Sequence, residues 1–387
     1  MKILILTLEF PPFAGGAGIY SHDLAKGFTN LGHKVTVLTR QYKNKKEQLE
    51  IDKKLLNIGI TVNRMFWVPK IWRLCCYFTA LKFLIQYRSD FEKIIITNNS
   101  ALELLSFMDN KILGDYNIAL HGTESNLYFK HYNLLNKLRY SKRGITKLLL
   151  EANRVICVSN FTAELTAKNI PAIRQKLVVV HNGIDLDRLH GQENDKNLFL
   201  PFLFNETDYY VVSIGRIIKD KGHDILIKSF LKVVKKIPNA KLLIIGEGPN
   251  KFRLQRLVIE LRLSNHVFLL GYLDNNSMLY VLKKSDLFAL ISRGEKRIEG
   301  FGLVYLEANA CKKIVIAGRT GGVPEAVEDG VSGLLVNPYD SGECANAIIT
   351  LLFDKKRRKE MEKKAYKRVI DSFTNVKMAE RTLMAIR

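Results

Sequence analysis

Cysteine is scarce in this chain, and its spacing suits neither a disulfide framework nor a zinc site. No two cysteines form a Cys-x-x-Cys pair, and disulfide scaffolds and structural zinc sites both need closely spaced sets. We therefore expect a reducing, cytoplasmic setting and no metal. The chain of 387 residues has five cysteines, namely Cys75, Cys76, Cys157, Cys311 and Cys344.

Long uncharged apolar runs are also missing. No stretch reaches the roughly 20 apolar residues that cross a bilayer as a helix. The opening MKILILTLEFPPF is apolar, but it soon meets Glu9 and two prolines, so it predicts a buried strand rather than a signal peptide. A chain with 47% hydrophobic and 25% charged residues is expected to be globular.

Acidic residues are few relative to basic ones. The 38 acidic residues stand against 60 lysines and arginines, which gives a formal net charge of +22. Such a field favours anionic partners, whether nucleic acid, an anionic membrane face or a phosphate-bearing ligand. A solvated lysine-rich surface without a partner is the alternative. No zinc finger, helix-turn-helix or RNA-recognition signature accompanies the charge, so we expect no nucleic acid partner.

Apolar runs alternate with helical patterns along the chain, and this alternation predicts parallel sheets wrapped by helices. The runs lack polar alternation, which indicates that both faces of each sheet are covered. The first series of expected strands is 2–7, 34–39, 60–67, 93–97, 117–120, 155–158 and 177–180. The second series is 209–214, 241–245, 267–270, 287–292, 314–317 and 333–336.

The restart of the pattern predicts an α/β protein of two Rossmann-like, doubly wound domains, 1–190 and 191–371, joined by a linker at about 191–205. The charged tail 355–387 reads as helical, and 372–387 is expected to pack back on the first domain. In open parallel sheets, ligands bind at the carboxyl ends of the strands, so a cleft between the domains is expected there.

The stretch EGFGLVYLE places two carboxylates around a helix start. Glycine disfavours a helix interior, so a helix should begin after Gly302, with Glu299 in the loop ahead and Glu307 inside. The amides of Phe301, Gly302 and Leu303 would then form an anion site. Carboxylates accept from hydroxyls and repel phosphate, so this pairing suits a ligand with both groups. A nucleotide sugar is such a ligand.

Two further glycine-rich turns follow strands. In GRIIKDKG, Arg216 and Lys221 come directly after the first strand of the second series, and Gly215 permits close approach, which suits a diphosphate. Gly15 and Gly16, with Gly18, follow the first strand of the chain and suit an anion nest. The pattern is not Gly-x-Gly-x-x-Gly, so a nicotinamide cofactor is not expected. A solvated basic turn is the alternative for GRIIKDKG, and a tight strand-to-helix turn is the alternative for the glycines.

His121 ends an expected strand in ALHGTES and is placed to orient a sugar hydroxyl or to stabilise charge at the reacting carbon. A structural histidine is the alternative. Asp185 and Asp187 spell a DxD, which can hold a metal and a diphosphate. Because they follow the Asn182-Gly183 turn, away from the cation pair, we interpret them as a turn and a helix cap.

Two regions of the first domain are both basic and apolar, and such helices can lie on an anionic membrane. Ordinary helices that cover a sheet are the alternative. The first region interleaves Lys70, Arg73, Lys82 and Arg88 with Trp72, Phe78, Phe83 and Tyr87. The second interleaves Lys137, Arg139, Lys142, Arg143 and Lys147 with Leu134, Leu135, Leu148 and Leu149.

Taken together, these motifs resemble those of the retaining glycosyltransferases of family 4, which have the GT-B fold. The resemblance runs along the chain and is strongest in the second domain. It rests on the glycine turn after FPP, on His121, and on the segments HNGID, GRIIKDKG, GEGP, E-x7-E and GGVPEAVEDGVSGLLV.

The resemblance implies a role for each matched residue. Arg216 and Lys221 would clamp the donor diphosphate, Glu307 the ribose hydroxyls and Glu299 the transferred sugar. The amides of residues 301–303 would hold sugar and phosphate, Gly16 the distal phosphate, and His121 the reacting face. The loop Gly271, Tyr272 and Leu273 would read the base through its backbone. His121, Glu299, Arg216 and Lys221 are the candidate catalytic set.

The implied reaction is transfer of a hexose, with retention and without a metal or other cofactor, from a GDP- or UDP-sugar. The acceptor would be a glycan or a lipid-linked saccharide at the inner face of the cytoplasmic membrane, in the synthesis of envelope polysaccharide, lipopolysaccharide or glycolipid. A nucleotide-sugar epimerase on the same fold is the alternative enzyme, and a nucleic-acid-binding protein is the remote one.

Overall fold

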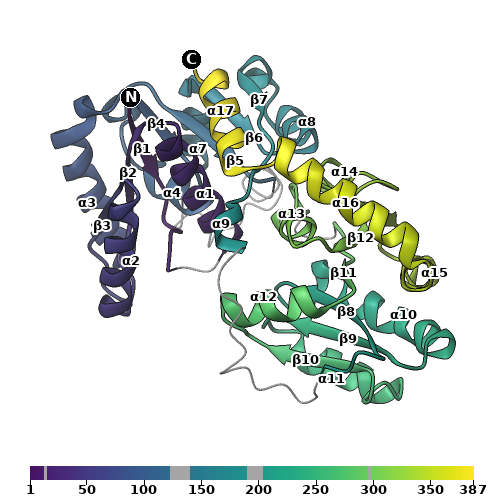
Figure 1. The fold of residues 1–387 in the computed structure, drawn as a ribbon. Coiled ribbons are helices and arrows are strands. Elements are labelled where there is room, and N and C mark those ends of the chain that lie inside the picture. The colour runs from purple at the N-terminus through teal and green to yellow at the C-terminus, as the bar shows by residue number, and fades with distance from the viewer. Residues whose placement is uncertain (13–14, 123–139, 190–203, 295–297) are drawn as a thin grey trace. The chain divides into compact units, whose positions relative to one another are not determined.

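The computed structural model of the chain describes residues 1–12, 15–122, 140–189, 204–294 and 298–387, and it divides into two compact units (Figure 1). Unit 1 comprises residues 1–185 and 373–387, and unit 2 comprises residues 186–372. The division therefore falls five residues before the expected first boundary and one residue after the expected second one. Most of the expected linker lies outside the described residues, as do Leu134, Leu135, Lys137 and Arg139 of the second basic region.

Unit 1 is built on a seven-stranded parallel sheet of order β3-β2-β1-β4-β5-β6-β7. The strands are β1 (Lys2–Leu6), β2 (Lys34–Arg40), β3 (Ile60–Met65), β4 (Lys93–Ile96), β5 (Asn117–Leu120), β6 (Arg154–Cys157) and β7 (Leu177–Val179). The helices are α1 (Gly16–Asn30), α2 (Lys45–Asn57), α3 (Trp72–Tyr87), α4 (Asn99–Leu105), α7 (Lys142–Glu151), α8 (Asn160–Asn169) and α17 (Asn375–Ala385). Short 3-10 turns are η1 (Arg88–Asp90), η2 (Asn110–Ile112) and η3 (Pro171–Lys176).

Unit 2 repeats the plan with a six-stranded parallel sheet of order β10-β9-β8-β11-β12-β13. Its strands are β8 (Tyr209–Ile214), β9 (Ala240–Ile245), β10 (Val267–Gly271), β11 (Leu287–Leu290), β12 (Ile314–Gly318) and β13 (Gly333–Val336). Its helices are α9 (Leu186–Leu189), η4 (Lys219–Lys221), α10 (His223–Lys236), α11 (Lys251–Glu260), α12 (Asn275–Lys284), α13 (Leu303–Ala310), α14 (Val323–Ala326), α15 (Ser341–Phe353) and α16 (Lys355–Ser372).

The expected strands all form, with ends shifted by at most two residues. Their apolar runs are buried because helices cover both faces of each sheet, as in β1 and β11, where nearly every side chain is enclosed. The prediction of two Rossmann-like parallel sheets is confirmed. In each unit the strand order reverses direction beside the first strand, and a ligand site is expected at the carboxyl ends there.

The helical tail is two helices, since the chain breaks at Phe373 and Thr374. Thr374 caps α17 by accepting a hydrogen bond from the amide of Lys377 at 3.2 Å. The α17 helix packs on α1 within unit 1, far from it in the sequence (Figure 1). The contact requires Gly27, because a Cβ there would lie 2.3 Å from the Asn375 carbonyl oxygen.

A fully buried histidine follows the η4 turn. His223 is 2% exposed, and neither of its ring nitrogens has a hydrogen-bond partner among the described residues. Burial, assisted by the Lys221 charge, lowers the pKa of His223 to about 4. The unfolded chain has a histidine pKa near 6.5. Between about pH 6.5 and pH 4, this histidine is therefore protonated in the unfolded chain and neutral in the folded chain.

Because the unfolded state gains that proton, we expect stability to fall as the pH drops from about 6.5 to 4, by roughly 3 kcal/mol from this residue. His223→Leu should flatten that dependence. Urea unfolding at neutral and mildly acidic pH measures it. His266→Leu is the control, since the His266 ring is only partly buried and bonds the Ala240 carbonyl. An unchanged pH slope in His223→Leu would contradict the prediction.

Candidate functional site

The predicted cation and carboxylate of unit 2 lie together as an ion pair. Lys221 Nζ contacts Glu299 Oε2 at 2.5 Å, and the two side chains are 19% and 21% exposed. Ser292 Oγ donates to the same carboxylate oxygen at 3.4 Å. Burial alone would raise the pKa of Glu299. The Lys221 ammonium, the hydrogen bonds and the Arg216 charge outweigh burial and hold that pKa below its usual value, so the carboxylate stays ionised.

The loop that carries Glu299 is fixed by its neighbours. The Glu299 carbonyl oxygen accepts a hydrogen bond from the amide of Gly322 at 2.9 Å. That glycine belongs to the GGVPEAV segment, to which sequence analysis gave no role of its own. The expected helix start is confirmed, because Gly302 precedes α13 with a φ of 103°, and a Cβ there would lie 2.4 Å from the Tyr305 ring.

Tyr305 fixes α13 against the sheet. Its hydroxyl donates to the Leu290 carbonyl at the end of β11, at 3.0 Å. Phe301 is buried, Gly302 is the N-cap of α13, and Leu303 is the first residue of that helix. The positive end of the helix dipole thus lies next to an anionic side chain and a lysine.

Glu307, inside α13 as predicted, contacts a residue that sequence analysis missed. Arg188 Nη2 of α9 lies 2.7 Å from Glu307 Oε1, and the two side chains are 20% and 12% exposed. No sequence signal linked the two, since 119 residues separate them. The guanidinium compensates the charge of a carboxylate that is mostly enclosed.

Arg216 and Gly215 follow β8 directly. The Gly215 amide donates to the Ile245 carbonyl at 3.0 Å, and the Ile217 amide to the Glu247 carbonyl at 2.8 Å, so this turn is tied to the end of β9. The Arg216 side chain is exposed, and its positive charge helps to lower the pKa of Glu299. The ends of β8 and β11 thus bring two cations and one carboxylate into one electrostatic site.

The segment expected to read the base lies at the end of β10. The Gly271 carbonyl accepts from the amide of Gly246 at 2.8 Å, which joins the ends of β9 and β10. Tyr272 is 69% exposed and Leu273 is half-buried. This segment therefore shares the carboxyl edge of the sheet with Arg216 and Lys221.

The predicted residues of unit 1 lie at the carboxyl edge of its own sheet. His121, after β5, contacts the Thr97 carbonyl through Nε2 at 2.8 Å; the carbonyl accepts, so Nε2 carries the proton. Its ring packs edge-on against Tyr20 at a centroid distance of 4.6 Å. Gly15 caps α1, and a Cβ there would lie 2.9 Å from Glu9 Oε2. Gly16 has open space on that side.

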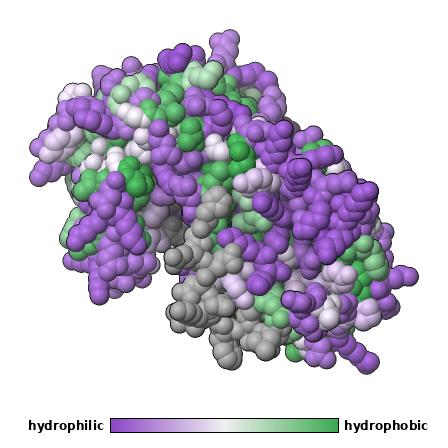
Figure 2. Space-filling view, viewed as in Figure 1, coloured by the Kyte–Doolittle hydropathy of each residue, from purple (hydrophilic) through white to green (hydrophobic). Residues whose placement is uncertain are grey.

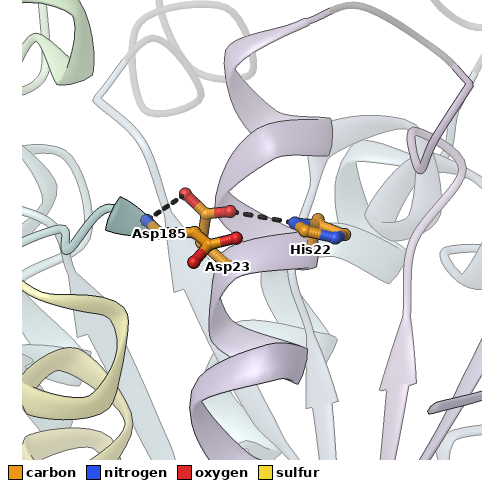
Figure 3. Close-up of side chains that lie close together, drawn as sticks. All are labelled: His22, Asp23 and Asp185. Atoms are coloured by element: carbon orange, nitrogen blue, oxygen red, sulfur yellow. Dashed lines mark hydrogen bonds and ion pairs between the residues drawn. The ribbon is translucent and has the colours of Figure 1, made fainter. Parts of the chain in front are cut away.

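The two aspartates of the DxD, Asp185 and Asp187, do not lie in one cluster. Asp185 joins His22 and Asp23 of α1, whose ligand atoms lie within 4.8 Å of one another (Figure 3). That spacing could hold a metal, but the atoms already have protein partners. Lys26 Nζ contacts both Asp185 oxygens at 2.9 and 2.8 Å, and Asp23 accepts from the His22 ring and the Asp185 amide. We interpret the cluster as structural, with Asp187 outside it in α9.

Two Rossmann-like parallel sheets in one chain, with cations and carboxylates at the strand ends of unit 2, are the architecture of the GT-B fold. The chain from Anabaena named HepE, solved in complex with UDP, has the same fold, with a TM-score of 0.75, 22% identity and coverage of 100% of this chain and 99% of that one.

The family follows from two family models. "Glycosyltransferase Family 4" matches residues 14–188, and "Glycosyl transferases group 1" matches residues 195–368, so together they account for most of both units. The chain belongs to the family 4 glycosyltransferases.

Similar proteins of this kind match along nearly the whole chain. N-acetyl-alpha-D-glucosaminyl L-malate synthase of Bacillus anthracis is 27% identical over 376 residues, which is 95% of this chain and 92% of that protein. A GDP-mannose-dependent alpha-(1-6)-phosphatidylinositol monomannoside mannosyltransferase of Mycolicibacterium smegmatis is 28% identical over 371 residues, which is 93% of this chain and 91% of that one. Among the described residues, no helix has the length and hydropathy that a membrane crossing requires.

Proposed function

We propose that this glycosyltransferase transfers a hexose, with retention, from a nucleotide diphosphate sugar to a lipid-linked or glycan acceptor. The observation that carries the proposal is the Lys221–Glu299 pair directly ahead of α13, with Glu307 held inside that helix. Such a site offers cations to a diphosphate and carboxylates to hydroxyl groups, and a nucleotide sugar presents both.

The donor proposal extends to GDP-mannose and to UDP-hexoses. The relative from M. smegmatis is named for its dependence on GDP-mannose, and the Anabaena structure was solved with UDP. Gly271–Leu273 would meet the base through main-chain groups, Arg216 and Lys221 the diphosphate, Glu307 the ribose and Glu299 the hexose. In unit 1, Gly16 and His121 would meet the distal phosphate and the reacting face.

The proposed chemistry needs no metal. Cleavage of the sugar–phosphate bond leaves positive charge at the anomeric carbon and negative charge on the departing diphosphate, which Arg216, Lys221 and the α13 dipole would stabilise. The departing phosphate oxygen takes the proton of the acceptor hydroxyl on the same face, so the new bond forms where the old one broke. Glu299 is engaged by Lys221 and is assigned no nucleophilic role.

The basic apolar helix α3 supports the proposed acceptor and its location. A peripheral position on the cytoplasmic membrane, in the synthesis of envelope polysaccharide, lipopolysaccharide or glycolipid, suits a chain of charge +22. The M. smegmatis relative is named for phosphatidylinositol monomannoside, a glycolipid, which supports a lipid-linked acceptor here.

Melting shifts with free nucleotides test the donor. UDP or GDP should raise the melting temperature in proportion to the logarithm of its concentration, because only a ligand of the folded state stabilises by mass action. AMP is the control. No shift with either diphosphate would overturn the proposal. Incubating the donor sugar alone then separates transfer from epimerisation, since an epimerase forms a new sugar isomer without an acceptor.

Glu307→Gln should raise the KM for the donor by roughly tenfold or more, since a hydrogen bond to a charged group contributes about 1.5–3 kcal/mol. Arg188→Ala should shift the same constant by less, because Arg188 acts on the donor only through Glu307, whose charge it compensates and whose carboxylate it orients, and Arg188→Lys should restore part of the loss. Steady-state kinetics measure both. Exposed Glu260→Gln on α11 is the control. A changed kcat with an unchanged KM would contradict the ribose assignment.

A further inference from the structure

An apolar cavity of about 330 Å³ lies between α3 and α4 in unit 1. Its volume is that of a small-molecule pocket. Leu8 lies just beyond β1, and α4 follows β4, so the cavity opens at the carboxyl edge of the sheet, where ligands of such folds bind. Its apolar lining includes Leu8, Trp72, Tyr77, Phe78, Leu104 and Phe107.

The rim of this cavity leaves large apolar side chains in solvent. Phe78 is 62% exposed, Leu74 is 59% exposed and Phe107 is 50% exposed. Figure 2 shows green apolar residues scattered among purple hydrophilic ones over the visible face of the molecule. Contiguous exposed apolar clusters rimmed by polar groups mark binding surfaces, whereas single exposed apolar residues are common on protein surfaces.

The charge around the cavity is positive. From Lys70 to Arg88 the chain carries four basic residues and no acidic one. The Trp72 ring has the Arg73 guanidinium 5.0 Å from its centroid and the Arg40 guanidinium 5.8 Å from it. Buried Glu103 contacts Arg73 at 3.1 Å, and the Glu9 carboxylate attracts the Arg40 charge. Basic residues still outnumber these two acids around the cavity, so an anionic group is favoured at the rim, beside an apolar interior.

We propose that this cavity binds the aliphatic chain of a lipid phosphate that serves as acceptor or acceptor anchor, with the phosphate at the Arg40 and Arg73 rim. The inference deepens the proposed acceptor class and rests on it. Leu8 links the cavity to the glycine turn, because the next residue, Glu9, has its carboxylate against Gly15. The head of the lipid would thus emerge beside the turn assigned to the donor phosphate.

Alkyl phosphates of increasing length test the pocket. The chain has two tryptophans, so Trp67→Phe leaves Trp72, in the pocket wall, as the sole tryptophan reporter. Butyl, octyl and dodecyl phosphate, each below its micelle concentration, should change its fluorescence saturably. Affinity should rise by roughly three- to fourfold per added methylene until the cavity is full. A change that does not saturate, or that ignores chain length, would overturn the proposal.

Matched variants separate the pocket from the helix surface. Phe78 lines the cavity, whereas Ile85, two turns further along α3 and 70% exposed, does not. Phe78→Asp should weaken dodecyl phosphate at least tenfold, and Ile85→Asp should leave it within twofold. Equal losses would mean adsorption to the helix face and would defeat the proposal. Equal binding of dodecanol and dodecyl phosphate would defeat the assigned role of the two arginines.

Nucleotide binding provides the independent arm. Should UDP or GDP shift the melting temperature while alkyl phosphates fail to bind, the pocket assignment falls and the donor site stands. Should alkyl phosphates bind without any nucleotide effect, the proposed transfer falls instead. A last experiment measures binding of the protein to vesicles of phosphatidylcholine with and without phosphatidylglycerol. If Ile85→Asp abolishes vesicle binding and Phe78→Asp does not, α3 contacts a bilayer through its outer face, and the cavity proposal is overturned.

Discussion

Lys221→Ala should lower the turnover number for sugar transfer by roughly a hundredfold or more, as does the loss of one donor that stabilises transition-state charge elsewhere. Two effects combine. The departing diphosphate loses a cation, and Glu299 loses the charge that chiefly offsets its burial, so the pKa of that carboxyl should rise. Steady-state transfer with a donor identified by the melting experiment measures the loss.

Lys235→Ala provides the matched control for this experiment. Lys235 is an exposed lysine of α10 in the same unit, so the substitution removes the same net charge away from Glu299. It should leave turnover within twofold. If Lys221→Ala also stays within twofold of the parent, Lys221 has no part in stabilising the leaving group.

Glu299→Gln should lower turnover by roughly ten- to a hundredfold and leave the affinity for free UDP or GDP nearly unchanged, because a hydrogen bond to a carboxylate is worth about 1.5–3 kcal/mol. The amide keeps the shape of the side chain but accepts more weakly from sugar hydroxyls. Calorimetric titration of the nucleotide, set beside transfer kinetics, separates the two effects.

The control for this substitution is Glu206→Gln, which changes an exposed carboxylate near the start of unit 2. A parallel loss of nucleotide affinity and turnover in Glu299→Gln would place Glu299 on the nucleotide rather than on the hexose. That result would also reverse the division of labour proposed between Glu299 and Glu307.

The strands and the α13 start could be predicted from the sequence because their causes are local. Uninterrupted apolar runs suit strands that are covered on both faces, and Gly302 marks where a helix begins. The C-terminal segment expected at 372–387 corresponds to α17, whose start is marked by Thr374, a good helix cap.

The partners of the site residues could not be predicted. The sequence placed Glu299 and Glu307 around a helix start, but Lys221 is 78 residues from its partner and Arg188 is 119 residues from Glu307. Such contacts depend on which strand ends meet at one edge of a sheet. Asp185 illustrates the same limit, since its partner Lys26 lies 159 residues away in α1.

The packing of α17 on α1 determines which fragments of this protein can be produced separately. The chain leaves unit 1 after Asp185 and re-enters it at Phe373. Hydrogen bonds join the two crossing points. The Ile184 amide donates to the Phe373 carbonyl at 2.8 Å, and the Asn375 amide donates to the Ile184 carbonyl at 2.9 Å. Unit 2 is therefore an insertion that could be excised as one continuous fragment. Unit 1 could not, because a fragment ending at Asp185 would bare the α1 surface around Gly27. Joining residue 185 to residue 373 by a short designed linker is the rational way to isolate it.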